Sequence, residues 1–284
     1  MNEAEFIDAL RGLARDPAAR GLLDDVAVLG DLVFTHDMIV EGVHFLPNDP
    51  PEDVAWKLVA VNLSDLAAKG AEPVGCLLGY TLGPAEWNAA FIAGLGAVLE
   101  HYSMPLLGGD TVKANGPRSF GLTAIGRSAH APAREGAQAG DALYVTGVIG
   151  RAGVGLELLK TGRTGPEIEA YRRPQPRLAE GRALAPVVHA MMDVSDGLLI
   201  DAARMAEASG LAVETDLDDV PVAGDPMRAV TAGDDYELLF AAPADLPLPV
   251  AATRIGRFAA GGGLSLTRGG QAIALPSSLG WVHD

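Results

Sequence analysis

The sequence contains one cysteine, few aromatic residues and no long apolar run. Cys76 is the only cysteine among 284 residues, which excludes an intramolecular disulfide and a zinc site built from several thiolates. It lies in the apolar segment 74–78, so we expect a buried, inert thiol. No apolar run reaches the roughly 18 residues of a membrane-spanning helix. Residues 1–5 are acidic, unlike the basic start of a signal peptide. We therefore expect a cytoplasmic protein outside the membrane.

Basic residues are scarce relative to acidic ones. The chain has 21 Lys and Arg against 37 Asp and Glu, a formal net charge of −16. This excess of negative charge disfavours nucleic acids and anionic membrane surfaces as partners, because both are polyanions. A phosphorylated substrate would meet the same repulsion unless bound divalent cations neutralised the charge locally. We therefore expect neither a nucleic-acid nor a membrane partner.

Three common catalytic motifs are absent from the sequence. There is no Gly-x-x-x-x-Gly-Lys-Ser/Thr loop, which excludes a P-loop kinase. There is also no Gly-x-Ser-x-Gly nucleophile elbow and no His-Glu-x-x-His zinc motif. Any phosphate chemistry must therefore use a different arrangement of residues.

The length and the apolar content of 49% allow two domains with separate cores. In the first half we expect helices at 3–14, 49–69 and 84–102, a hairpin of strands 26–29 and 32–35, and strands at 74–81, 105–107 and 119–127. In the second half we expect strands at 142–146, 211–215, 236–241 and 253–258, helices at 152–160, 177–189 and 197–209, and an exposed loop at 161–176.

This alternation of strands and helices indicates an α/β or α+β class for both halves. Residues 128–140 are mostly small or polar, a composition typical of a domain junction. We place an N-terminal α/β domain at 1–134 and a C-terminal α/β domain at 135–284.

Aspartates recur at the edges of apolar stretches. The five segments are Leu22-Leu23-Asp24-Asp25-Val26, Thr35-His36-Asp37, Asn62-Leu63-Ser64-Asp65, Gly108-Gly109-Asp110-Thr111 and Asp193-Val194-Ser195-Asp196-Gly197. Carboxylates are costly to bury unless something positive joins them. We therefore expect the segments to share a cation site. Oxygen ligands select hard ions, and Mg²⁺ typically combines a few carboxylates with substrate phosphates.

Each of these acidic residues also has an ordinary structural interpretation. Asp65 could form a helix-surface ion pair with Lys69, four residues on. One residue of Asp193, Ser195 and Asp196 could cap the helix that follows. The segment offers three oxygens where a cap needs one, and a helix start also presents amides that suit phosphate.

Asp110 follows two glycines and the short strand expected at 105–107. A carboxylate at the end of a strand faces the usual ligand crevice, although a turn residue would look the same. The acidic run Gly233-Asp234-Asp235-Tyr236-Glu237 is either part of a site or a solvated turn. His44 is either a ligand-binding or a structural histidine.

Together these segments resemble the thiamine-monophosphate kinase family, in the superfamily that includes aminoimidazole ribonucleotide synthetase. The resemblance runs from about residue 24 to 281. It is carried by the segments at 37–45 (Asp-Met-Ile-Val-Glu-Gly-Val-His-Phe), 61–71, 108–111 (Gly-Gly-Asp-Thr), 193–198 and 233–238. Gly-Gly-Asp-Thr is shared across the superfamily, whereas Val-Glu-Gly-Val-His-Phe and Asp-Asp-Tyr-Glu-Leu-Leu are typical of the kinase.

The resemblance implies ATP-dependent phosphorylation of thiamine monophosphate to thiamine diphosphate. It also implies a two-domain aminoimidazole ribonucleotide synthetase-like fold, with a C-terminal mixed sheet covered by helices. The N-terminal sheets of a homodimer would pair into a barrel. Mg²⁺ ions would be required, and whether K⁺ assists stays open.

The resemblance also implies roles for particular residues. The metal ligands would be Asp25, Thr35, Asp37, Asp65, Asp110, Asp193 and Asp196. The ATP site would include Tyr102, Gly109, Asp110, Arg134 and Ser195. The thiamine moiety would contact His44, Glu237 and Trp281. No protein residue is expected to act as a base or nucleophile, because the metals assist direct transfer.

The sequence departs from the family pattern at two places. Leu22-Leu23 replaces the Ile-Gly that usually precedes the paired aspartates, and His36 replaces a threonine that would offer oxygen to Mg²⁺. Two alternatives therefore stay open. One is another ATP-dependent enzyme of the superfamily, acting on a different phosphate or amide substrate. The other is a non-catalytic metal-binding homologue. The cysteines typical of selenophosphate synthetases and hydrogenase-maturation proteins are absent from the expected positions.

Overall fold

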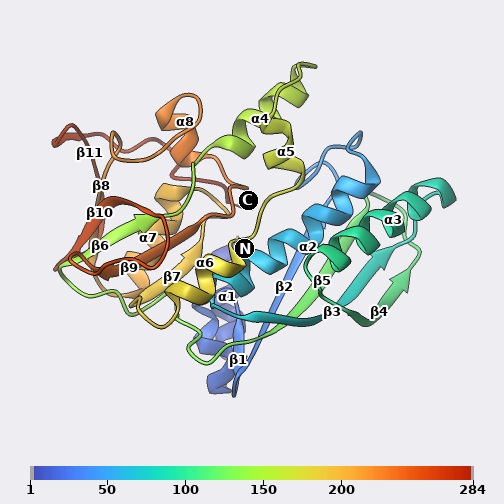
Figure 1. The fold of residues 1–284 in the computed structure, drawn as a ribbon, viewed down its shortest axis with the longest axis horizontal. Helices are drawn as coiled ribbons and strands as arrows, with labels where there is room; N and C mark the ends of the chain where they lie inside the picture. The colour runs from blue at the N-terminus through green and yellow to red at the C-terminus, as the bar shows by residue number, and fades with distance from the viewer. Residues whose placement is uncertain (1–2, 283–284) are drawn as a thin grey trace.

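The computed structural model describes residues 3–282, which form two lobes, each built around its own β-sheet (Figure 1). The elements of the first lobe are α1 (Glu3–Arg11), a 3₁₀ turn (Pro17–Leu22), β1 (Ala27–Leu29), β2 (Leu32–Val40), α2 (Pro51–Ala68), β3 (Glu72–Thr81), α3 (Ala85–His101), β4 (Leu106–Val112) and β5 (Ser119–Arg127). Those of the second are β6 (Asp141–Val145), α4 (Arg151–Lys160), α5 (Glu167–Arg172), α6 (Leu178–Leu184), β7 (Ala190–Asp193), α7 (Leu198–Ala208), β8 (Ala212–Asp216), α8 (Pro226–Thr231), β9 (Leu238–Pro243), β10 (Thr253–Ala259), β11 (Gly263–Arg268) and β12 (Gln271–Ile273).

The first sheet has the strand order β1-β2-β5-β3-β4. The predicted hairpin is confirmed: β1 and β2 pair antiparallel, and Gly30 turns the chain with a φ of +65° that glycine adopts at little cost. Aromatic rings from α3 and from the sheet stack together, among them Trp87 on Phe120. Helices α2 and α3 cover one face of this sheet (Figure 1). Strand β4 lies at the edge, and all its residues are exposed.

The second sheet is mixed, with the order β12-β11-β8-β10-β6-β9-β7. Its internal strand β6, between β10 and β9, is buried along its whole length, and its buried side chains pack with those of α7. The two-domain fold with a mixed C-terminal sheet and helices is therefore confirmed. The short strands β11 and β12 and the helix α8 lie in segments for which the sequence analysis predicted no element.

Helix α2 joins the two lobes, as Figure 1 shows. Fourteen of its eighteen residues are buried, including the polar Asn62 and Asp65. At its C-terminal end, Ala67 and Ala68 pack into a cluster with Met191 of the second sheet. A helix that is buried on all sides must satisfy its polar groups through tertiary contacts.

Two local predictions are wrong. The segment 161–176 was expected to be an exposed loop, but it contains α5, whose Tyr171 is buried with the Lys57 ammonium 4.0 Å from its ring centroid. The strand expected at 105–107 continues through both glycines as β4, so Asp110 lies within a strand and not at its end. Only glycine fits at position 109, because the Cβ of any other residue would lie 1.9 Å from the Leu78 carbonyl oxygen.

Among residues 3–282, no helix combines the length and the apolar character needed to cross a membrane. The prediction that Cys76 is buried is confirmed.

Candidate functional site

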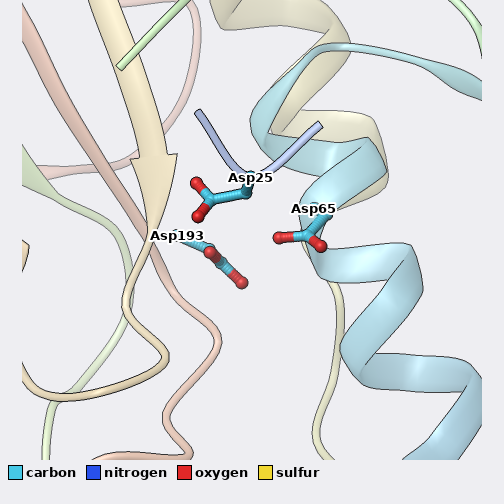
Figure 2. Close-up of side chains that lie close together, drawn as sticks. All are labelled: Asp25, Asp65 and Asp193. Carbon is cyan, nitrogen blue, oxygen red and sulfur yellow. The ribbon is translucent and has the colours of Figure 1, made fainter. Parts of the chain in front are cut away.

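Three aspartates from distant parts of the chain meet between the two lobes (Figure 2). Asp25 lies in the loop before β1, Asp65 lies on α2, and Asp193 ends β7. One carboxylate oxygen from each lies within 4.8 Å of the others. Asp65 and Asp193 are buried, and the Asp25 side chain is 25% exposed, so the cluster has one side open to a ligand.

Neighbouring donors orient these carboxylates. The Thr35 hydroxyl donates to Asp65, the Ser64 hydroxyl donates to Asp193, and the Arg134 guanidinium pairs with Asp25. Among residues 3–282, the second oxygen of Asp25 is buried without a hydrogen-bond partner. Buried acceptors are nearly always satisfied, so this atom is suited to accept an additional group.

Burial, together with the acidic neighbours, raises the pKa values of Asp65, Asp193 and Asp37. Burial raises the pKa of Asp193 to about 8, and the charge of Asp25 adds to this rise. The pKa of Asp65 is raised well above its ordinary value, first by burial and then by its acidic neighbours. The same causes raise the pKa of Asp37 to about 6. At neutral pH the cluster therefore resists full ionisation unless positive charge joins it.

The donor set fits a hard divalent cation. All three clustered ligands are carboxylate oxygens, and Thr35 adds a hydroxyl that donates a hydrogen bond to Asp65. Mg²⁺ favours such oxygen ligands over nitrogen and sulfur. The partnerless oxygen of Asp25 and the raised pKa values both indicate that the site is suited to bind positive charge.

Asn62 holds Asp37 beside this cluster. Its side-chain oxygen accepts the backbone N–H of Asp37 at 3.0 Å, and its amide nitrogen donates to the Leu58 carbonyl at 2.9 Å. Strand β2 is thereby fixed to α2, and the charges of Asp25 and Asp196 both act on Asp37.

The loop that follows β7 is held by residues that the sequence analysis missed. The carboxylate of the fully buried Asp201 accepts the backbone N–H groups of Asp196 and Gly197, each at 3.2 Å. Arg204 pairs with both Asp196 and Asp201. The interpretation that Asp193, Ser195 or Asp196 caps the next helix is wrong, because its N-cap is Gly197, without a side-chain cap. The spacing of Asp201 and Arg204, three residues apart on a helix, was the available signal.

The ion pair suggested between Asp65 and Lys69 is also absent from the described structure. Lys69 is fully buried and instead pairs with Asp24 at 2.6 Å, next to the cluster. Burial alone would raise the pKa of Asp24, but Lys69 and Arg20 together lower it. Asp24 therefore anchors its loop, which leaves the adjacent Asp25 to face the cluster.

The residues expected at the ATP site are not all together. Arg134 contacts Asp25, and its Nε is buried without a partner among residues 3–282. The Ser195 carbonyl accepts the Asp234 amide at 2.8 Å in the loop after β7. Tyr102 instead directly follows α3, lies beside Trp56 and lines a different cavity of about 420 Å³.

Gly109 and Asp110 lie far from the cluster within the chain. Asp110 pairs with Gly79 of β3, Gly79 with Gly121 of β5, and Gly121 with Met38 of β2. Neighbouring strands lie about 4.8 Å apart, so roughly 14 Å of sheet separates Asp110 from the strand that carries Asp37. Asp110 therefore does not join Asp25, Asp65 and Asp193 in one copy of the chain.

The three residues expected around the acceptor have separate local surroundings. Nδ1 of His44 accepts the Val40 amide at 3.0 Å. Glu237 is buried beside a cavity of about 110 Å³. The backbone N–H of Trp281 donates to the Asp196 carbonyl at 2.8 Å, and its side chain is half-exposed.

The two departures from the family pattern have local explanations. Leu23 has a φ of −105°, a conformation open to any residue, so no glycine is needed there. The His36 ring contacts the Thr123 hydroxyl at 2.9 Å on the exposed face of the sheet. Successive strand residues face opposite sides, so the His36 side chain points away from Thr35 and Asp37.

Comparisons with known proteins give a consistent result. The model of the AIR synthase related protein N-terminal domain matches residues 23–128, and that of the C-terminal domain matches residues 138–272. A thiamine-monophosphate kinase of Caulobacter vibrioides is 38% identical, covering 96% of this chain and 88% of that protein. One of Salmonella typhimurium is 35% identical, covering 99% and 92%. The structure of AaThiL complexed with AMPPCP and TMP has a TM-score of 0.90 at 28% identity, covering 100% and 97%.

The raised pKa values predict how stability depends on pH. The folded state holds the Asp193 proton up to a pKa of about 8, whereas the unfolded chain releases it near the ordinary value of 3.8. Stability without metal should therefore fall as pH rises through this interval, and the loss should be complete above it. Thermal unfolding in a chelator should show this fall, and Mg²⁺ should reduce it.

Substitution of Asp193 by Asn should reduce this pH dependence and leave the part that Asp37 and Asp65 contribute. At pH 8 in a chelator, D193N should raise the free energy of unfolding by at least about 1 kcal/mol. This figure is a lower bound, because a shift of a single pKa unit already corresponds to about 1.4 kcal/mol. It should also lose most of the stabilisation by Mg²⁺. D218N, a change on an exposed carboxylate, is the matched control. A D193N protein that is less stable than D218N at pH 8 would contradict this account.

Proposed function

This chain belongs to the thiamine-monophosphate kinase family of the AIR synthase related proteins, and we propose that it transfers the γ-phosphoryl group of ATP directly to thiamine monophosphate. The products would be thiamine diphosphate and ADP. The observation that carries the proposal is the convergence of Asp25, Asp65 and Asp193 between the lobes. A location in the cytoplasm, expected from the sequence, remains part of the proposal.

The acceptor group is a phosphate oxygen that is already ionised at neutral pH. No protein base is therefore required, and the main obstacle is the repulsion between two polyanions. Like unit charges about 4 Å apart repel by roughly 4 kcal/mol at an effective dielectric constant near 20. Mg²⁺ ions at the carboxylates would supply the positive charge that offsets this repulsion and aligns the in-line attack.

The protein's own groups would position the reactants. Arg134 would donate to a phosphate oxygen, and this role is supported by its contact with Asp25 and by its buried Nε, which has no partner among residues 3–282. Thr35, Ser64 and Asn62 fix the carboxylates and β2 before any ligand arrives. Such preorganisation reduces the reorganisation needed during transfer.

The complete set of roles follows the sequence analysis. The proposed metal ligands are Asp25, Thr35, Asp37, Asp65, Asp110, Asp193 and Asp196. The proposed ATP-binding residues are Tyr102, Gly109, Asp110, Arg134 and Ser195. The proposed acceptor-binding residues are His44, Glu237 and Trp281. We keep the domain boundary between residues 134 and 135, supported by sheets that end at Arg127 and begin at Asp141.

Asp110 and Gly109 could join the site of a second copy of the chain. Their strand β4 has an open edge, and the apolar side chains exposed on this sheet include Met38, Leu77, Leu106, Leu107 and Val112. Exposed apolar surface on an edge strand is suited to pairing with another chain. We propose a homodimer in which the N-terminal sheets pair, so that each Asp110 serves the partner's cluster.

The acceptor can be tested by measuring ADP release. With Mg²⁺ and ATP, we expect release to rise strongly when thiamine monophosphate is added, and thiamine diphosphate to form in equal amount. An aminoimidazole-pathway substrate should give only the rate seen without an acceptor. Activity with that substrate alone would favour a sister enzyme, and release with neither would favour a non-catalytic homologue. A phosphorylated protein trapped during turnover would contradict direct transfer.

The contribution across the dimer can be tested by mixing two inactive variants. D65A and D110A should each abolish activity while remaining folded. A heterodimer of the two would retain one site with both residues intact. Random re-association of equal amounts should therefore restore about a quarter of wild-type activity, since half of the dimers are mixed. No recovery in heterodimers verified by two affinity tags would show that Asp110 does not act across the interface.

A further inference from the structure

Glu237 is held by three donors at the edge of the small cavity between α4 and the segment before α6. Arg177 donates through its Nε to Oε2 at 2.7 Å and through its Nη2 to Oε1 at 2.5 Å. The Thr146 hydroxyl also donates to Oε2, at 2.6 Å, and itself accepts the Leu238 amide at 2.8 Å. The bidentate contact with Arg177 and the hydrogen bond from the buried Thr146 hydroxyl thus fix the orientation of the carboxylate.

The surroundings leave Glu237 little freedom to adopt another position. Its side chain is 8% exposed. A Cβ on Gly147, whose φ is +58°, would lie 2.0 Å from Oε1, so only glycine leaves room for the carboxylate. The pKa of Arg177 is raised, chiefly by its hydrogen bonds to Glu237. The Arg177–Glu237 pair is therefore a stable unit within the pocket wall.

The pairing determines what this pocket presents to a ligand. Charged residues of both signs line the cavity, including Arg151, Arg173, Asp234 and Asp235. A carboxylate has about four lone-pair positions, and three of those on Glu237 are already used. Its charge is balanced by Arg177, so the pair offers one directed hydrogen-bond acceptor and little net negative charge.

We propose that Arg177 is a positioning residue for acceptor recognition, because it holds the Glu237 carboxylate as a neutralised, directed acceptor for an N–H donor of the substrate. The inference rests on the proposed function, in which Glu237 contacts the acceptor. Arg177 acts through Glu237, and it touches neither Asp25 nor Asp65 nor Asp193 among the contacts described.

The test compares R177Q, R177K, E237Q and the double variant R177Q/E237Q. R228Q is the matched control, since the Arg228 side chain is 78% exposed and pairs with Glu157 at the surface. We expect R177Q to raise KM for thiamine monophosphate at least about tenfold, the loss of one charged hydrogen bond. Its kcat and its KM for ATP should stay within about twofold of wild type. R177K should recover part of the loss, because lysine keeps the charge without the planar fork.

The double variant separates positioning from direct contact. If Arg177 acts through Glu237, R177Q/E237Q should have nearly the same KM as E237Q alone. Effects that multiply would show that Arg177 binds substrate independently and would overturn the inference. A purely structural role would instead lower the melting temperature of R177Q and change the KM for both substrates. If R177Q does not fold, the graded loss in R177K serves the same purpose.

Calorimetric binding of thiamine monophosphate distinguishes failure of this inference from failure of the proposed function. Binding to wild type that weakens at least about tenfold in R177Q, with no turnover in either, would refute the kinase activity and support the inference. Turnover by wild type with an unchanged KM in R177Q would refute the inference alone. Absence of binding to wild type would overturn both.

Discussion

Mutual repulsion among buried carboxylates is the constraint on which this structure depends. Carboxylate oxygens of Asp25, Asp65 and Asp193 approach within 4.8 Å, and burial, with the charge of Asp25 adding to it, raises the pKa of Asp193 to about 8. A fold that brings like charges together is less stable, and a cation that binds between those charges in the folded state stabilises it. Divalent cations and the phosphates that they carry have the matching charge. The same feature that weakens the metal-free protein therefore creates its affinity for a polyanionic ligand.

Helix α2 is the element that turns this constraint into a site. It is buried on nearly all sides and carries polar groups that contact other elements: Asn62 fixes β2, Ser64 orients Asp193, and Lys69 neutralises Asp24. Each of these groups has a partner, which makes the polar interior compatible with stable folding. Because α2 contacts both sheets, the geometry of the carboxylates is set by the packing of the two lobes.

Local signals were sufficient to predict much of this arrangement. Helix α2 and the hairpin at Gly30 follow from periodicity, capping and turn chemistry, which depend on neighbours in sequence. The location of Asp110 could not be predicted, since it depends on how many strands separate β4 from β2. Tyr171 in α5, Asp201 and Arg177 were missed because their partners lie in distant segments or, for Asp201, in a loop whose path depends on the fold. The family resemblance supplied roles that spacing alone could not.

The most direct test of this account is a crystal structure with Mn²⁺ in place of Mg²⁺, using anomalous scattering to locate the ions. The account predicts an anomalous peak between Asp25, Asp65 and Asp193, with metal–oxygen distances of roughly 2.1–2.3 Å, near the range for small hard cations. It also predicts that this peak disappears in a crystal of the D65A variant. Peaks confined to other parts of the molecule, with the three carboxylates uncoordinated, would contradict it.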